Sequence, residues 1–421
     1  MNESTSHFRC ILCKNETKRV FKSDDYEGKI FFNQCPYCKG DLILETIYGI
    51  EKQHQKMSDV PQKELEEIIR KYYTITAVSV YPELIIFEVE GPSDASSFYD
   101  TIVEATLQHG YVPLLRREKT VEKKEKKVIL CTRKNWTDDL PKKRVTYGLL
   151  SVTVLTTFIA GLTFSWNFYE SMFERILGAL SFSGALLLIL GMHELGHKRA
   201  ANMNKVLATN PYFIPAPPLI SIFGTFGAII KVKSPVPNRN AAIELGAAGP
   251  LLSFALSIPM VILGTIFSKV VSKSSTDTGG ILFQLPIIMI LLFSIFAPQV
   301  NAGEALLLHP IAFAGWIGIF VTAINLFPVG QLDAGHVSRA NLGEKGHLIL
   351  TQIVIVFLLV LGIFLWTTWI VWSFLLLILS RNGHPGSLDD ISPISRRNKV
   401  ISVLLVIIFF LSFTPVPVKF V

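Results

Sequence analysis

Apolar runs long enough to cross a lipid bilayer fill most of this chain after residue 144, and they constrain its fold more than any other feature. A membrane-spanning helix needs about 20 consecutive apolar residues. Half of the 421 residues are hydrophobic and the mean hydropathy is +0.43, values too high for an ordinary water-soluble domain. The first 140 residues are polar by comparison. The sequence therefore predicts a polytopic α-helical membrane protein with a water-soluble N-terminal head.

The apolar runs predict spans that alternate in direction. Single spans are expected at Val145–Trp166, Ile176–Met192, Leu245–Ser268, Leu306–Leu326 and, as a short last crossing, Val400–Phe413. The run 348–380 has 33 uncharged residues. It would be about 50 Å long as a straight helix, so we expect two short spans divided near Trp366–Trp369. The apolar segment Ile281–Val300 is interpreted as interfacial, re-entrant or packed on the body, because one more crossing would invert everything after it.

Positive charge is concentrated directly before the first span. Residues 116–144 contain 12 Lys and Arg against 5 Asp and Glu, a surplus equal to the +7 of the whole chain. Basic residues beside a span usually stay in the cytoplasm and contact anionic lipid. We therefore predict a basic juxtamembrane segment and a cytoplasmic head on a multi-pass protein of the cell membrane. Nucleic-acid binding is less favoured because the segment adjoins a span and offers few aromatic side chains. The polar N-terminus also predicts no secretory signal peptide.

Four of the five cysteines form two CxxC pairs, Cys10 with Cys13 and Cys35 with Cys38, separated by 21 residues. Two such knuckles supply four thiolates for one tetrahedral zinc ion. Two disulfides are the alternative, but a cytoplasmic head keeps its thiols reduced. The pattern predicts a zinc ribbon over residues 1–45 with a structural zinc. The remaining cysteine, Cys131, stands alone and is expected to be a buried apolar residue.

Residues 59–133 have the pattern of a small α+β domain. A helical stretch begins at Pro61, and two strand patterns surround a turn at residues 81–83. A second helical stretch ends at Gly110 and is followed by two more strand patterns. The order α-β-β-α-β-β predicts a ferredoxin-like sandwich, in which we find no catalytic constellation. The partner of this head stays open.

Two histidines and a glutamate follow the uncharged run that ends at Met192. His193 and His197 are four residues apart, so they share one helix face and can present two imidazoles to one metal ion. Glu194 lies about 100° around the helix, where it can act as a base without chelating. The HExxH spacing is typical of zinc peptidases. A histidine pair that is only hydrogen-bonded inside the bundle is less favoured, because ionisable residues in spans are usually functional.

A catalytic zinc needs a third protein ligand and one open coordination position. Asp333 follows a long uncharged run, where a lone carboxylate is costly unless it is paired or bound to metal. His336 is the rival ligand, whereas His309 lies at the opposite end of the run and is too far away. For Asp333 to meet the two histidines, the span that precedes it must end on the cytoplasmic side.

The sequences HELGH (193–197) and NLFPVGQLDAGH (325–336) resemble the two signature motifs of the site-2 protease family, which are intramembrane zinc metalloproteases. The resemblance covers about residues 145–400. Three further stretches are most similar to its archaeal, bacterial and plastid branch: residues 211–230, 247–250 and 308–320.

The resemblance implies a role for each matching residue. It makes His193, His197 and Asp333 the ligands of a catalytic zinc, and Glu194 the catalytic base. Asn325 matches the asparagine that precedes the aspartate in the family. Ala334 departs from the glycine of many relatives, but it is small and follows the ligand, so it puts little in doubt.

The sequence GTFG (Gly224, Thr225, Phe226 and Gly227) lies outside all predicted spans, in a β-prone stretch. One interpretation is a loop hairpin packed on the membrane body. The other is a strand edge that binds the substrate by β-addition, with glycines that allow another backbone to approach. We favour the substrate-binding edge.

The predicted function is a zinc-dependent endopeptidase that cuts transmembrane helices near the cytoplasmic face, as in regulated intramembrane proteolysis. Glu194 would move the proton of the attacking water to the leaving amine, and Asn325 would help to hold the peptide. A membrane metal transporter is one alternative, disfavoured by the base beside the ligands and by the lack of an obvious inverted repeat. A catalytically silent scaffold is another, disfavoured by the intact HELGH. The substrate and the oligomeric state stay open.

Overall fold

The structure, a computed structural model, describes residues 61–81, 84–119, 125–134, 143–217, 221–272, 281–381 and 383–420, and the backbone alone of residues 4–10, 16–21 and 42–47. The three backbone segments are β1 (Ser4–Cys10), β2 (Glu16–Phe21) and β3 (Leu42–Ile47), which pair antiparallel in the order β2-β1-β3. Cys13, Cys35, Cys38 and the side chain of Cys10 lie outside the described residues, so the predicted Cys₄ site stays a prediction.

The second part of the head alternates helices and strands. Its elements are α1 (Gln62–Arg70), β4 (Thr74–Tyr81), β5 (Leu84–Glu90), α2 (Tyr99–Gln108), β6 (Tyr111–Lys119) and β7 (Glu125–Arg133). The strands pair antiparallel in the order β6-β7-β5-β4. Apolar side chains from α1, α2 and the alternate positions of β5 form the core, among them Leu65, Ile102 and Phe87. Cys131 is fully buried in this core, as predicted, and burial raises the pKa of its thiol to about 12.

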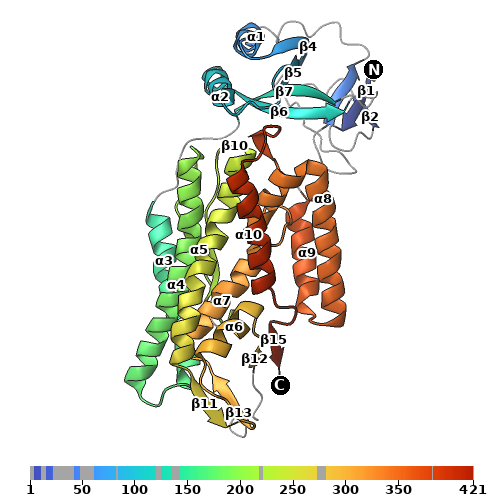
Figure 1. The fold of residues 1–421 in the computed structure, drawn as a ribbon. Coiled ribbons are helices and arrows are strands. Elements are labelled where there is room, and N and C mark those ends of the chain that lie inside the picture. The colour runs from blue at the N-terminus through green and yellow to red at the C-terminus, as the bar shows by residue number, and fades with distance from the viewer. Residues whose placement is uncertain are drawn as a thin grey trace.

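The head sheet continues into the helical body. Strands β10 (Val236–Asn238) and β14 (Ser387–Asp389) pair parallel with each other, and Asp389 of β14 pairs with Leu115 of β6. The six-stranded order is β10-β14-β6-β7-β5-β4. The Arg116 guanidinium in β6 donates to the carbonyl of Leu388 at 3.1 Å. The head therefore sits on one end of the helices through a shared sheet (Figure 1).

Eight helices make up the body among the described residues (Figure 1): α3 (Lys143–Trp166), α4 (Met172–Met203), α5 (Arg239–Ile266), α6 (Ile287–Phe296), α7 (Pro310–Asn325), α8 (Asp333–Phe364), α9 (Thr368–Ser380) and α10 (Arg396–Ser412). Of these, α3, α4, α5 and α8 are long and apolar enough to cross a membrane, and α6, α7 and α9 are shorter apolar helices. The division of the run 348–380 falls between Phe364 and Thr368, as predicted.

Some helix ends differ from the predicted ones. The expected span Leu306–Leu326 begins as a strand, β13 (Glu304–Leu307), and its helix starts only at Pro310. His309 caps this helix by accepting a hydrogen bond from the Ile311 amide, and proline is favoured in the first turn. Helix α6 has 10 residues, about 15 Å, which is too short to cross a bilayer. Helices α4 and α8 continue past their apolar runs, so the ionisable residues singled out by the sequence lie within helices.

Short antiparallel hairpins and bridges complete the body. Strands β8 (Tyr212–Pro215) and β9 (Thr225–Ile229) pair between α4 and α5. Strand β11 (Lys269–Ser272) pairs with β13, and β12 (Ile281–Phe283) pairs with β15 (Val418–Phe420). Both pairs lie at the end far from the head (Figure 1).

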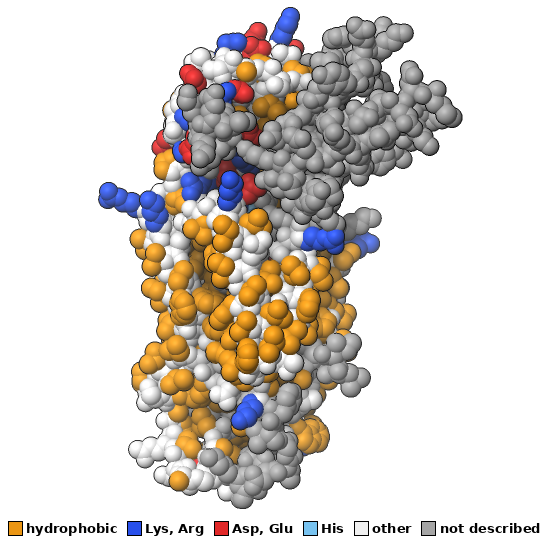
Figure 2. All heavy atoms as spheres, turned by 90° about the vertical axis from the view of Figure 1, so that its right-hand side faces the viewer, with side chains coloured by type: hydrophobic (Ala, Val, Ile, Leu, Met, Phe, Trp, Pro, Cys, Tyr) orange, Lys and Arg blue, Asp and Glu red, His pale blue; other side chains and the backbone are white. Residues whose placement is uncertain are grey.

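Hydrophobic side chains cover the outside of the helices. Figure 2 shows them over the face formed by α8, α9 and α10, with Lys and Arg gathered where this surface meets the head. Exposed examples are Phe357 in α8, Phe374 in α9 and Phe410 in α10. Arg396 and Arg397, at the start of α10, are exposed at the head end. This distribution suits a helical body surrounded by lipid, with its basic end beside the head.

Candidate metal centre

Three side chains from two distant helices converge near the head end of the body. His193 and His197 lie one turn apart on α4, and both are buried. Asp333 is the first residue of α8, and its Oδ2 lies 3.2 Å from the Nε2 atoms of both histidines. The two Nε2 atoms are 3.1 Å apart. Among the described residues, these three form the one cluster whose ligand atoms could hold a metal ion.

Hydrogen bonds on the outer side of each imidazole decide which ring nitrogen faces the cluster. His197 Nδ1 lies 2.7 Å from the Leu245 carbonyl, so it must carry the proton that it donates. His193 Nδ1 lies 3.1 Å from the Ser253 hydroxyl, which is itself placed to donate to the Gly249 carbonyl at 3.2 Å. Both imidazoles therefore keep their protons on Nδ1 and direct the lone pairs of Nε2 toward each other and toward Asp333.

This arrangement fits a bound zinc ion. Asp333 Oδ2 is buried and has no hydrogen-bond partner among the described residues. Two imidazole lone pairs and a carboxylate oxygen at 3.1–3.2 Å would repel one another without a cation between them. Zinc–ligand bonds of about 2.0–2.1 Å in tetrahedral geometry separate two ligand atoms by about 3.3 Å. The donor set, its spacing and its outward hydrogen bonds all match that geometry.

Glu194 lies beside the three ligand atoms and is not one of them. Its Oε1 is 4.0 Å from His193 Nε2, and the side chain is buried. The backbone of Ile230, just after β9, also makes a hydrogen bond with this carboxylate. A carboxylate at this distance can reach a water held between the ligands and a substrate, which is the position that a general base requires.

Helix α5 approaches the ligands closely because it carries glycine where it faces them. A Cβ atom at Gly249 would overlap Nε2 of His197, and one at Gly246 would overlap the carbonyl oxygen of Asp333. The sequence GAAG thus packs α5 against both α4 and α8 at the height of the cluster. The same approach brings the Leu245 carbonyl within reach of His197.

A hollow of about 230 Å³ opens beside the ligands. Besides the cluster, its walls include Asn325, Gln331, His336 and residues of the β9 region: Ala228, Ile229, Ile230 and Val232. Asn325 Nδ2 is 3.3 Å from His193 Nε2, so the predicted peptide-holding residue does lie at the centre. His336, the rival ligand, also lines the hollow, but its Nδ1 is bonded to His384 at 2.8 Å.

Gly224 directly precedes β9, the other three residues of GTFG are its first three, and none of the four lines this hollow. Gly224 has φ +76 and packs against the α3 backbone at Thr156, and the Thr225 hydroxyl donates to the Ile214 carbonyl. The Phe226 side chain is exposed. The end of the same strand, Ala228 to Ile230, is the part beside the metal ligands. The sequence pattern predicted a β-prone stretch, and β9 forms within it. Which of its residues lie beside the cluster depends on how the hairpin packs on α3 and α4, and no local pattern indicates that.

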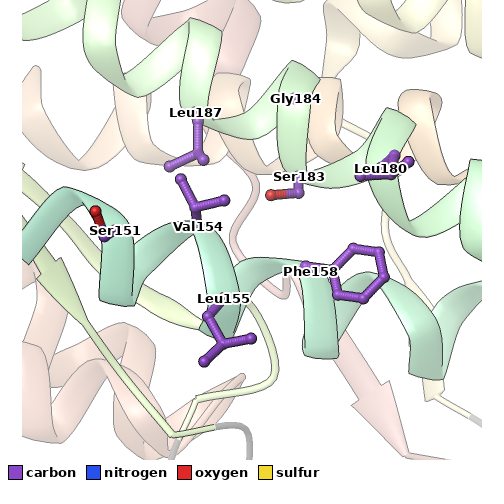
Figure 3. Close-up of a pocket in the computed structure, with 8 residues that line it drawn as sticks. All are labelled: Ser151, Val154, Leu155, Phe158, Leu180, Ser183, Gly184 and Leu187. Carbon is purple, nitrogen blue, oxygen red and sulfur yellow. The ribbon is translucent and has the colours of Figure 1, made fainter.

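A second hollow of about 430 Å³ lies between α3 and α4, away from the ligands. Figure 3 shows Val154 of α3 facing Leu187 of α4, with Phe158 and Leu180 further along the same two helices, and Leu155 is also part of the lining. Ser151, Ser183 and Gly184 complete its lining. No titratable side chain lines it, so the lining offers neither a metal ligand nor a base that could activate its two serine hydroxyls.

Comparisons with known proteins agree with this geometry. The model of peptidase family M50 matches residues 181–366, which include the three ligand residues and Glu194. The chain is 31% identical over 258 residues to "Probable zinc metalloprotease EGY1, chloroplastic" of Arabidopsis thaliana, covering 59% of this chain and 45% of that protein. It is 30% identical over 157 residues to "Probable zinc metalloprotease EGY2, chloroplastic" of Oryza sativa subsp. indica, covering 37% of this chain and 28% of that protein. It is 21% identical over 259 residues to "Probable zinc metallopeptidase EGY3, chloroplastic" of Arabidopsis thaliana, covering 58% of this chain and 44% of that protein.

The matched region thus spans less than half the length of these curated relatives. No solved structure matches the chain.

Proposed function

We propose that the chain is a zinc-dependent endopeptidase of the site-2 protease type that cleaves transmembrane segments of other membrane proteins, in line with its match to peptidase family M50 over residues 181–366 and its similarity to probable zinc metalloproteases. The observation that carries this proposal is the convergence of His193, His197 and Asp333 around one point, with Glu194 beside them. All of these groups lie in helices that are apolar enough to cross a membrane.

In the proposed reaction, Glu194, the two histidines and Asn325 have different roles. A bound zinc ion would polarise the scissile carbonyl and make the attacking water more acidic. Glu194 takes a proton from that water as its oxygen bonds to the carbonyl carbon, and passes the proton to the amine when the C–N bond breaks. The outward hydrogen bonds of His193 and His197 keep the two imidazoles in place. Asn325, 3.3 Å from His193, is placed to hold the peptide beside them.

The substrate is proposed to bind in extended form along β9. A helical segment hides its carbonyls in its own hydrogen bonds, so it must be unwound before hydrolysis. One edge of β9 pairs with β8, and among the described residues no strand pairs with the other edge. The end of β9 reaches the hollow at Ala228 to Ile230. Addition of the substrate to that free edge would replace its lost backbone bonds and lead it to Glu194.

The orientation of the chain is a further part of this proposal. The cluster lies toward the end of the body that carries the head, and Lys and Arg gather at that end (Figure 2). By the positive-inside rule this end is cytoplasmic. We therefore place the head in the cytoplasm, the protein in the cell membrane with several spans, and the cut near the cytoplasmic face.

For the head, we propose a structural zinc held by Cys10, Cys13, Cys35 and Cys38 in the ribbon 1–45, and a ferredoxin-like domain over residues 59–133. The antiparallel order β6-β7-β5-β4, with α1 and α2 packed on the same core, supports the second assignment. The chain would then hold two zinc ions, one structural and one catalytic.

The test is cleavage of membrane proteins in cells that carry wild type or Glu194→Gln. We expect the Gln variant to keep zinc in the membrane body while intact or partly trimmed membrane proteins accumulate. Asp333→Asn is the matched comparison, because an amide is a poor ligand for zinc and should lower zinc content. A Glu194→Gln variant that loses zinc would make Glu194 a ligand. If membrane proteins were cut equally in cells with either form, the cleavage would not depend on this site, and a metal transporter would be the better function.

A further inference from the structure

His336 lies in the first turn of α8, one turn after the ligand Asp333, and lines the hollow beside the metal ligands. Its Nδ1 is 2.8 Å from Nε2 of His384, which lies in the turn between α9 and β14. The two rings are nearly perpendicular, with centroids 4.6 Å apart. The proposed function gives neither histidine a role.

The backbone around His384 determines where the protons of both rings lie. The Gly386 amide donates a hydrogen bond to His384 Nδ1 at 3.0 Å, so this nitrogen must present a lone pair. The proton of His384 is therefore on Nε2, from which it is donated to Nδ1 of His336. His336 in turn has its proton on Nε2, the nitrogen that is left for the hollow.

Several contacts hold this pair in its neutral form. A second proton on His336 would have to sit on Nδ1, against the proton that His384 donates. Burial, with His336 and His347 nearby, lowers the pKa of His384 to about 2. The turn itself is held by the head, because Arg116 donates to the carbonyls of Pro385 and Leu388. The hydrogen-bond chain from Gly386 to His384 to His336 thus leaves one N–H donor at the hollow.

We propose that His336 is a catalytic residue that donates this Nε2–H to the carbonyl oxygen of the scissile peptide, and that His384 is the positioning residue that fixes its tautomer. The inference rests on the proposed protease function. When water adds to the carbonyl carbon, the π electron pair moves to that oxygen, and the charge that develops there strengthens the hydrogen bond from His336. When the oxygen re-forms its double bond and the C–N bond breaks, the charge is lost and His336 still has its proton.

A neutral imidazole suits this role. It donates to the developing oxyanion without first being protonated, and it holds its direction through the bond on its other nitrogen. The same tautomer argues against the rival assignment of His336 as a zinc ligand, since Nε2 carries a proton and the lone pair of Nδ1 is engaged by His384. Asn325 reaches the centre from the end of α7, so two donors would approach the peptide from different helices.

The test uses the full chain in liposomes with a single-span reporter that has a Leu-rich segment and a Gly-Pro pair near its cytoplasmic end. Wild type and Glu194→Gln come first, since equal cleavage by both, or none by either, contradicts the proposed function itself. For His336→Ala we expect kcat to fall about 100- to 1,000-fold. We also expect KM to change by less than about threefold and zinc content to stay at the wild-type level, because the bond forms mainly in the transition state.

Two further variants separate catalysis from packing. His336→Gln keeps an N–H donor at similar reach and should recover about tenfold or more of the lost kcat. His384→Phe should lower kcat without changing zinc content, because His336 can then adopt the other tautomer. The matched control is His309→Gln, which alters a buried histidine that is bonded to Tyr169 at the start of α7 and does not line the hollow. It should keep kcat close to wild type.

The remaining outcomes each overturn the inference. Zinc loss in His336→Ala would make His336 a ligand. An unchanged kcat with a raised KM would make it a ground-state contact. A loss that His336→Gln does not restore, or that His309→Gln reproduces, would reduce it to a packing residue. In each of these cases, Glu194-dependent cleavage by wild type would leave the proposed function intact.

Discussion

The Nδ1 atom of His197 lies 2.7 Å from the carbonyl oxygen of Leu245 on the neighbouring helix α5. That carbonyl comes from the first half of α5, directly before Gly246 and Gly249, which allow the helix to lie against both ligand helices. A backbone group is a suitable partner for a metal-binding imidazole, since its position is set by helix packing rather than by a rotamer. The close approach of α5 is therefore part of the metal centre.

Gly249→Ala tests this closeness directly. A methyl group would overlap Nε2 of His197, so we expect the membrane zinc site to lose affinity by at least about tenfold and cleavage to fall with it. The control is Gly184→Ala, on α4, where an added Cβ meets no atom within 4 Å. That variant should keep its zinc and be slightly more stable, because alanine favours helix. Equal zinc content in the two variants would contradict the steric argument.

Ser253→Ala tests the second imidazole. Removal of its hydroxyl takes away the acceptor of the His193 Nδ1 proton, so the ring can rotate or change tautomer. Loss of such an outer partner usually costs about 10- to 100-fold in metal affinity. Ser257→Ala is the control, since that buried hydroxyl donates to the Ser253 carbonyl and has no bond to a ligand. Titration with zinc in detergent, against a competing chelator, measures the zinc affinity of both variants. Similar affinities for the two would contradict a role of Ser253 in holding His193.

Substrates with a helix-breaking pair near the cut should be processed faster than all-leucine spans of equal length. Glycine disfavours helix by about 1 kcal/mol and proline by about 3 kcal/mol relative to alanine. A substrate helix with such a pair therefore needs less free energy to unwind before it is cut. The measurement is the cleavage rate of a matched series in which the pair moves along the span. A rate that is independent of the position of the pair would contradict strand addition at β9 and leave the zinc chemistry untouched.

Asp390→Asn is expected to weaken the joint between head and body. Asp390 Oδ2 lies 2.7 Å from Arg339 Nη2, and both side chains are at least nine-tenths buried. Neutralising one partner of a buried pair typically costs about 3–5 kcal/mol, because the other charge stays buried alone. Thermal unfolding of the full chain should show a clear fall in Tm. Glu104→Gln is the control: its pair with Lys205 is 3.4 Å long and exposed, so Tm should not change measurably.

Local signals predicted which side chains meet in the cluster of His193, His197 and Asp333. HELGH and Asp333 were recognisable because charged side chains rarely stand beside long apolar runs unless they bind something. The break at residues 365–367 followed from length alone, since the run 348–380 is too long for one upright crossing. Each of these signals is contained in one short stretch of sequence.

Features that depend on distant segments were not predictable in this way. Strands β10 and β14 have three residues each, too few for a pattern, and become strands only because they meet β6. The His384–His336 bond joins residues 48 positions apart, and nothing near His384 in the sequence indicates it. Nothing in the sequence indicates that Gly227 has φ +101, where a side chain would strain the backbone by about 1–3 kcal/mol.

The shared sheet has a consequence for how the protein can be divided. Because β14 lies between β10 and β6, a chain shortened to begin at α3 would leave one side of β14 with unpaired amides and carbonyls. Unpaired strand edges are common starting points for aggregation. The turn that holds His384 would also lose the two contacts from Arg116. The head is thus better regarded as a support for the segment that carries His384 than as a detachable unit.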